Sequence, residues 1–514
     1  EFIPYAVDGA IPLLTHLTYA LGLGLGGELT LNLWVFFSQG FLILGVYGVA
    51  RRRLPRLYAM MISLVLYTTA GMIFAGGTGQ IEPKTALFML LAAVAVADGI
   101  QKNKRIYFIL AGLLAGVFLA SKYHGIFAAV SLIAVIFFYP SRLSRVGIFS
   151  FCALLSGAQW YGWNTFHTGM PIFPTMYSWG LSGWGGHWDP DIDARFTELM
   201  GACLPESIFL VLTYPILATL SPQEYWDNQR TGLGPYLWFL LPATAYLTWN
   251  IVRNKVRVTR SSLFPLMLPA MTFYMLWVLI PSGSLITRHL LPIYPLILIG
   301  ISTSIYVYSV RQSIAWLRLN LMMSMMFSIA IGVGILFLYS QNYFRYHWTG
   351  ETRNDFYQRN ISYYEGVRWV NGNLPKTSRI AHQARYHNYL LSGPYFLISP
   401  KMWLALPPEG VGVAQVRQAF CRERIGYLMF VGTYPPYRDA LELDVVFSSE
   451  SPQILSRTLS NLSIAATTEV GEPSNDTVSS RGLTRSYWSP SSVSVARIKW
   501  ETMDSYEDCV EVDR

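Results

Sequence analysis

The sequence predicts a polytopic α-helical membrane protein of about 10 to 11 spans with a soluble α/β domain on its outer face. Of the 514 residues, 52% are hydrophobic and only 13% are charged, and the mean hydropathy is +0.33. These values lie outside the range of an ordinary soluble globular chain. Ten apolar stretches are long enough to cross about 30 Å of hydrocarbon. They run approximately over 31–50, 57–76, 84–100, 106–122, 124–139, 146–164, 234–251, 262–281, 289–309 and 319–339.

The positions of Lys and Arg in the short loops predict the orientation of these spans. Short loops that stay in the cytoplasm retain basic residues. The basic loops lie at 51–56, 102–105, 142–145, 253–260 and 311–318. All five basic loops lie on the cytoplasmic side if all ten stretches cross the membrane and the segments 10–25 and 206–220 lie as helices on the outer surface. The net charge of +8 then reflects topology and requires no nucleic-acid partner.

This orientation predicts the location of the protein and of its polar loops. Glu82, Lys122, the loop 165–233, Arg288 and the C-terminal residues all face the outer compartment. We expect a multi-pass protein of a bacterial inner membrane with a periplasmic C-terminal domain, or a luminal one if the host is eukaryotic. The first residue is Glu1 and not Met, so either a segment has been removed or the numbering begins inside an outer loop. An eleventh span upstream of Glu1 would put the native N-terminus in the cytoplasm.

The composition divides the chain into three parts. Residues 1–340 form the predicted transmembrane domain with its outer loops 10–25 and 165–233. From about residue 341 charges return and hydrophobic runs shorten, which predicts an α/β domain over 341–450. Its expected elements are a helix at 363–374, strands near 379–382, 395–398 and 427–431, and a helix at 413–424, in an order that suggests a partly parallel sheet. Residues 451–514 are rich in Ser and Thr, and we expect them to be loose and poor in strands.

Lys122 and His124 lie at the outer end of the predicted span 106–122. A cation at the mouth of a membrane helix is costly and is usually kept for a function. We interpret the pair as ligands of a phosphate or pyrophosphate at the membrane surface, where Lys acts as a point charge. The alternative is that Lys122 only extends towards the interface.

Arg288 and His289 precede the span that begins near residue 289. Free N–H groups at a helix start attract anions, and an Arg there adds a two-pronged donor. We therefore assign both residues to the same phosphate. The alternative is an anchor that binds lipid head groups in the outer leaflet.

Glu82 lies at the outer start of the span 84–100, two residues before Lys84. It could orient an acceptor hydroxyl, coordinate a cation, or pair with Lys122 or Lys84. Its simplest role is that of an acid at a helix N-terminus, which the helix dipole favours.

The outer loop after the span 146–164 is rich in aromatic residues and prolines. Aromatic rings stack on sugars, but they also anchor helices at the membrane interface. Candidate substrate contacts here and beside Lys122 are Tyr123, Trp160, Asn164, Pro171 and Pro174. Further along, Asp189, Asp191 and Asp193 alternate in a way that could hold a divalent cation, although a solvated turn is the stronger interpretation.

Four segments together resemble the GT-C glycosyltransferases, in particular the bacterial mannosyltransferase and aminoarabinose-transferase-like branch. They are 12–27, 112–123, 160–174 and 287–295, and the segment 364–375 resembles the start of the outer domain of that group. The resemblance implies a GT-C-like core, a polyprenyl-phosphate sugar donor, and transfer to a lipid, glycan or protein acceptor on the outer face, usually with inversion. It also implies an acidic residue in the first outer loop as base or metal ligand, for which Asp8 and, by alignment with a later loop, Glu82 are the candidates.

A second class of function fits the same residues. A non-enzymatic protein that binds or carries a lipid-linked substrate, or a structural subunit with the same fold, would keep the outward cations without the chemistry. A transporter should instead show paired broken helices with polar residues at the midplane. The polar residues here gather at outer ends, which favours binding or chemistry at the membrane surface.

Overall fold

The computed structural model describes residues 11–177, 232–255, 261–280, 287–382, 385–397, 423–431, 443–450 and 492–498, with a few single residues between these ranges. The chain divides into two compact units, Glu1–Gln341 and Asn342–Arg514. Each unit is described separately below.

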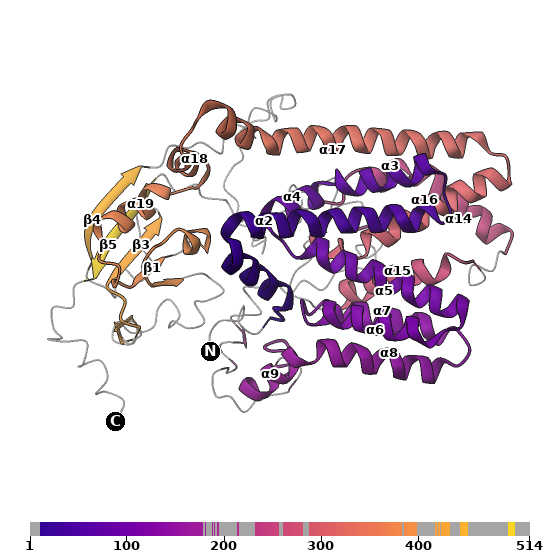
Figure 1. Ribbon diagram of the computed structural model, residues 1–514, viewed down its shortest axis with the longest axis horizontal. Coiled ribbons are helices and arrows are strands. Elements are labelled where there is room, and N and C mark those ends of the chain that lie inside the picture. The colour runs from indigo at the N-terminus through magenta and orange to yellow at the C-terminus, as the bar shows by residue number, and fades with distance from the viewer. Residues whose placement is uncertain are drawn as a thin grey trace, which may run out of the picture. The chain divides into compact units, whose positions relative to one another are not determined.

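The first unit is a bundle of apolar helices (Figure 1). Its core is one continuous cluster of buried aliphatic and aromatic side chains to which nearly all of these helices contribute. The helices are α2 (Leu14–Arg51), α3 (Arg56–Tyr67), α4 (Ala70–Thr78), α5 (Glu82–Lys102), α6 (Arg105–Leu119), α7 (Gly125–Phe137), α8 (Arg142–Gly157), α9 (Gln159–Thr168), α13 (Tyr236–Phe239), α14 (Leu241–Arg253), α15 (Phe264–Leu279), α16 (Tyr294–Arg311) and α17 (Ala315–Thr349), with the 3₁₀ turn η3 (Thr287–Leu290) before α16.

Several of these helices have the length and composition of membrane spans. Within the described ranges, α2, α5 and α17 are long and apolar enough to cross a bilayer, and α3 with α4 adds a fourth span if this pair, bent by 60°, is counted as one. Three shorter helices, α6, α7 and α15, are also apolar. The chain is therefore a membrane protein with several apolar helices, while the count of ten spans stays a prediction.

Helix α2 is broken near its start. Gly26 and Gly27 have non-helical dihedrals, and Gly27 combines φ 65° with ψ −157°. This combination is accessible essentially only to glycine. The break separates residues 14–25, predicted to form an outer-surface helix, from the longer part that continues to Arg51, and Figure 1 shows the first part turned back on the second.

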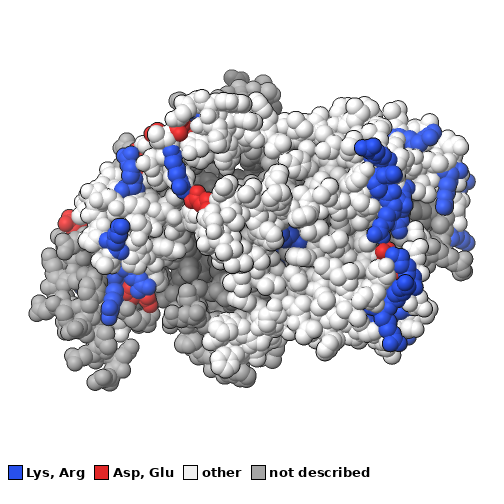
Figure 2. Space-filling model, in the orientation of Figure 1, with Lys and Arg blue, Asp and Glu red and all other residues white. Residues whose placement is uncertain are grey.

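Basic side chains gather at one end of the first unit. Arg52 and Lys102 both bind Asp98, at 3.0 and 3.1 Å, and Arg145 donates to Asn103 Oδ1 at 2.7 Å. Figure 2 shows this blue end next to a broad white surface that a single small blue patch interrupts near the middle of the view. Since α5 runs from Glu82 to Lys102, Glu82 lies at the opposite end of the bundle, as the loop charges predict.

Helices α6 and α8 approach each other at glycines. A Cβ added to Gly116 would meet the Ala153 carbonyl oxygen, and one added to Gly112 would meet that of Phe149. Small residues allow helix backbones to come this close in membranes. This contact fixes the helix that ends next to Lys122.

Replacing Gly116 with Leu is therefore expected to separate α6 from α8. Overpacking of this kind costs about 1–3 kcal/mol, and here the obstacle is backbone that cannot rotate away. Gly48→Leu on α2 is the matched control, because a Cβ at Gly48 would meet nothing within 4 Å. Thermal unfolding of the purified variants in lipid nanodiscs checks this, and equal midpoints for the two variants would contradict it.

The second unit contains a five-stranded mixed sheet in the order β2-β1-β3-β5-β4. The strands β1 (Ile380–His382), β2 (Tyr395–Leu397) and β3 (Tyr427–Val431) are parallel, whereas β5 (Ser492–Ile498) runs antiparallel between β3 and β4 (Leu443–Glu450). Val367 and Val370 of α19 (Tyr364–Asn373) pack with Ile380, Met429 and Val495 in its core. Helix α18 (Arg353–Asn360) precedes α19 and begins with a capping box between Thr352 and Asp355.

The strands expected near 379–382, 395–398 and 427–431 and the helix at 363–374 are present. The structure differs from the sequence-based expectation at 492–498, which belongs to the segment expected to be poor in strands. There Val495 and Ala496 are fully buried because β5 lies between two partners. Of the helix predicted at 413–424, half of the residues are described, and 417, 418, 420 and 421 among them are helical; most of 451–514 lies outside the described residues.

Candidate functional site: an outward-facing cation cluster

Lys122 is held in a tight turn between α6 and α7. Its N–H donates to the Phe118 carbonyl at 3.1 Å and its carbonyl accepts from Gly125 N–H at 2.8 Å. A Cβ on Gly125 would collide with the backbone of Leu119, so only glycine permits the chain to fold back here. The turn therefore fixes the direction in which Lys122 leaves the end of α6.

Glu82 is the anionic partner of this lysine. Its carboxylate is only 2% exposed, and Oε1 lies 2.9 Å from Lys122 Nζ. Arg288 Nε lies 3.8 Å from the same oxygen. Glu82 Oε2 has no hydrogen-bond partner among the described residues. Of the roles considered for Glu82, pairing with Lys122 is therefore present in the structure, and one carboxylate oxygen remains available.

Arg288 and His289 approach from η3, which is far from Lys122 in the sequence. The rings of His289 and His124 lie 4.5 Å apart between centroids, and both residues are nearly buried. The Arg288 side chain is 28% exposed and that of Lys122 is 18% exposed. The structure thus brings together five residues that the sequence singled out separately: Glu82, Lys122, His124, Arg288 and His289.

Lys84 is a site residue whose importance the sequence analysis missed. It is 6% exposed, and its Nζ has no hydrogen-bond partner among the described residues. Instead, Nζ lies 3.6 Å from the centroid of the Tyr19 ring and 5.0 Å from that of Trp34. Aromatic faces attract a cation but do not neutralise it. The available signal was a second charge in the first turn of an otherwise apolar helix.

The cluster carries an excess of positive charge. In the described part of the site, Lys122 and Arg288 share the single carboxylate of Glu82, while Lys84, two residues further along α5, has only aromatic rings against its Nζ. Positive charge that is withdrawn from water without a matching anion is costly. An anionic group such as a phosphate at this position would remove that cost. The arrangement is therefore suited to bind an anion.

A hydrogen-bonded network supports the Lys122 turn from the neighbouring loop. Asn164 is fully buried, and its Nδ2 donates to Tyr123 Oη at 2.9 Å and to the Pro171 carbonyl at 3.2 Å. Tyr123 Oη in turn donates to the Phe173 carbonyl at 3.0 Å, next to the cis bond that precedes Pro174. In this structure Tyr123, Asn164 and the two prolines hold the turn in place, whereas their contact with a substrate stays a prediction. Trp160 is half-buried on the same helix α9.

The predicted metal ligands give no cation site in the described part of the chain. Asp193 Oδ1 accepts a hydrogen bond from Trp188 Nε1 at 3.0 Å. Asp189, Asp191 and the candidate base Asp8 lie outside the described residues. Within the described ranges, no three His, Cys, Asp or Glu side chains are grouped to hold a metal ion. A divalent cation therefore remains only a prediction.

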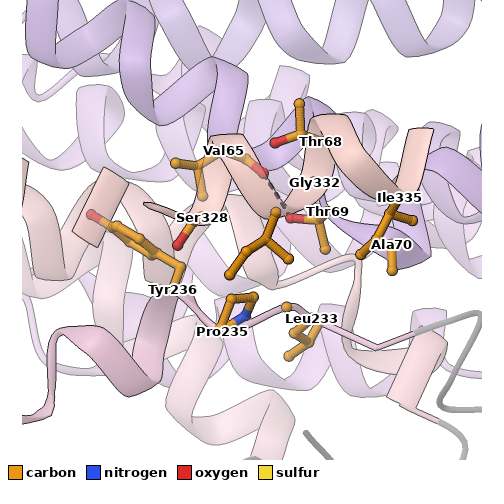
Figure 3. Close-up of a pocket in the computed structure, with 12 residues that line it drawn as sticks. Val65, Thr68, Thr69, Ala70, Leu233, Pro235, Tyr236, Ser328, Gly332 and Ile335 are labelled. Carbon is orange, nitrogen blue, oxygen red and sulfur yellow. Dashed lines mark hydrogen bonds between the residues drawn. The ribbon is translucent and has the colours of Figure 1, made fainter. Parts of the chain in front are cut away.

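A small cavity lies elsewhere in the first unit, at the break between α3 and α4 (Figure 3). Thr68, Thr69, Tyr236 and Ser328 line it, and Gly332 allows α17 to approach the Thr68 carbonyl closely. The space open to the centre of a water molecule is about 10 Å³. That is roughly the room needed by one water molecule, so this cavity cannot hold a sugar or a lipid phosphate.

The comparisons with known proteins identify the fold. No family model and no curated protein matches the sequence. Two solved structures are similar to it: the crystal structure of ArnT from Cupriavidus metallidurans in the apo state, and that of the same protein bound to undecaprenyl phosphate. Each has a TM-score of 0.51 and 14% sequence identity, and each match covers 85% of this chain and 86% of the other. The chain therefore shares the fold of these two structures.

Proposed function

We propose that the protein is a glycosyltransferase that moves a sugar from a polyprenyl-phosphate donor to a lipid, glycan or protein acceptor on the outer side of the membrane. The observation that carries the proposal is the meeting of Lys122 and Arg288, from two distant segments, at the carboxylate of Glu82. The similar structure with bound undecaprenyl phosphate supports a lipid phosphate as the ligand class.

The proposed step is a direct displacement at the sugar. The acceptor hydroxyl oxygen bonds to the anomeric carbon, and the bond from this carbon to the phosphate oxygen breaks. The electron pair stays on the departing polyprenyl phosphate, and the hydroxyl proton passes to a carboxylate base. Lys122 and Arg288 stabilise the negative charge that grows on the phosphate, which is where fixed cations accelerate such reactions most.

Glu82 is the proposed base among the described residues, and Asp8 is the alternative. A base must reach the proton that it accepts. Glu82 Oε1 is occupied by Lys122, but Oε2 has no partner within the described part of the chain. Glu82 therefore has one oxygen for the ion pair and one that could accept a proton.

The rival function is a lipid-phosphate binder without catalysis. The cation cluster fits both functions, because both require an anion at Lys122 and Arg288. The two functions differ in whether the bond between sugar and phosphate is broken.

The test is consumption of donor by the protein in native membranes. Membranes that contain the protein are incubated with radiolabelled polyprenyl-phosphate mannose, glucose, galactose and aminoarabinose, and the released polyprenyl phosphate is measured. We expect release from at least one donor, and a much slower release with Lys122→Met. Binding of the donors without any release would overturn the enzymatic function in favour of the rival one.

A further inference from the structure

The first part of α2, Leu14–Gly26, lies as a strap over the cation cluster. Leu14 N–H donates to the Ala120 carbonyl at 3.0 Å, and Thr15 Oγ1 donates to Ser121 Oγ at 2.7 Å, directly beside Lys122. Ser121 is fully buried under this contact. The strap thus begins on the turn that carries the central lysine.

The strap also covers the start of α5. Tyr19 Oη donates to the Gln80 carbonyl at 3.1 Å, and the Tyr19 ring lies on Lys84 Nζ. Trp34, on the other side of the break in α2, donates to Thr18 Oγ1 at 2.9 Å and adds a second ring near Lys84. Two cations of the cluster, Lys84 and Lys122, are therefore next to the strap or underneath it.

The strap is joined to the rest of α2 by a glycine hinge. The folded-back arrangement requires Gly27 to keep φ 65° with ψ −157°. Ordinary rotation at Gly26 and Gly27 into helical dihedrals would extend the strap as a continuation of α2 and lift Tyr19 and Thr15 from the cluster.

The outer face of the strap is apolar and uncharged. Leu17, Leu21 and Leu25 follow one another at four-residue spacing and are 54%, 63% and 76% exposed. Residues 14–26 contain no Lys, Arg, Asp or Glu. An uncharged helix with an apolar stripe can lie in the interface of a bilayer, which suits the folded-back position.

We infer that Leu14–Gly26 is a gate, which hinges at Gly26 and Gly27 and controls access of an anionic lipid head group to Lys84 and Lys122. The inference rests on the proposed function only for the identity of the head group. Closure places Tyr19 over Lys84 and Thr15 over Ser121 beside Lys122, and opening removes both contacts while Trp34 stays on the fixed part of α2.

The test measures access to Ser121 and requires no ligand. Ser121→Cys is reacted with a water-soluble maleimide in lipid nanodiscs, and the parent protein, whose Cys152 is buried, gives the background rate. Adding Gly27→Ala should accelerate labelling about tenfold, because alanine is strained in the dihedrals of the closed gate. Gly24→Ala is the matched control: a Cβ there meets nothing within 4 Å, and the residue is inside the strap helix.

Two outcomes would overturn the gate. One is an equal labelling rate with and without Gly27→Ala, and the other is the same acceleration by Gly24→Ala. Because labelling does not depend on donor binding or transfer, either result would leave the proposed function untouched. If the parent protein neither binds nor uses the donors, the proposed function fails, but the gate is unaffected and would control access of a different anion.

Discussion

Replacing Lys122 with Met is expected to reduce sugar transfer by roughly 10²–10³-fold, the usual effect of removing one fixed group that stabilises developing negative charge. Met keeps most of the length of the side chain but removes the charge that pairs with Glu82 at 2.9 Å. The measurement is the rate of polyprenyl-phosphate release at saturating donor.

The controls separate local charge from total charge. Lys104→Met removes an exposed cation in the loop between α5 and α6, at the opposite end of the bundle, and is expected to leave the rate unchanged. Lys122→Arg keeps the charge and should retain more activity than Lys122→Met. A Lys122→Met protein that turns over at the parental rate would remove Lys122 from the mechanism.

Replacing Glu82 with Gln is expected to destabilise the first unit by about 3 kcal/mol, because breaking a buried ion pair leaves a charge without its partner. The carboxylate is 2% exposed and faces both Lys122 and Arg288, so its charge is not replaced by solvation when it is removed. Thermal unfolding in nanodiscs gives the loss of stability. If Glu82 is also the base, transfer should fall further than the unfolded fraction explains.

The double variant Glu82→Gln with Lys122→Met distinguishes these roles. Removing both charges of the pair should restore most of the stability lost in Glu82→Gln, since neutral side chains of similar size are well tolerated in place of a buried pair. Transfer should remain absent. A double variant as unstable as Glu82→Gln alone would show that the 2.9 Å contact is not what stabilises this region.

The grouping of the site could be predicted from sequence because membrane topology constrains it. The alternation of basic loops places Glu82, Lys122 and Arg288 at one end of a bundle before any distance is known. The bundle then has few ways to bring three helix ends together. Gly112 and Gly116, before Lys122, are small residues of the kind that allow close helix contacts in membranes, and α6 and α8 do meet there.

The cover on Lys84 could not be predicted in the same way. Tyr19 and Trp34 reach one lysine only because the chain reverses at Gly26 and Gly27, and a pair of glycines in an apolar segment specifies no direction. Strand β5 is a different case, because the sequence itself contains the alternating pattern of a strand there. Val493 and Val495 alternate with serines in the pattern of a strand. The Ser-rich composition around them nevertheless favoured the prediction of loose structure.

The most direct test of the account compares the binding of polyprenyl phosphate and of the corresponding polyprenol to the protein in nanodiscs. These two lipids share the hydrocarbon chain and differ in the phosphate. With a phosphate site at Lys122 and Arg288, the parent protein should bind polyprenyl phosphate clearly more tightly than polyprenol. This preference should be lost in Lys122→Met and in Arg288→Met. Equal binding of the two lipids by the parent protein would contradict a phosphate site at Lys122 and Arg288.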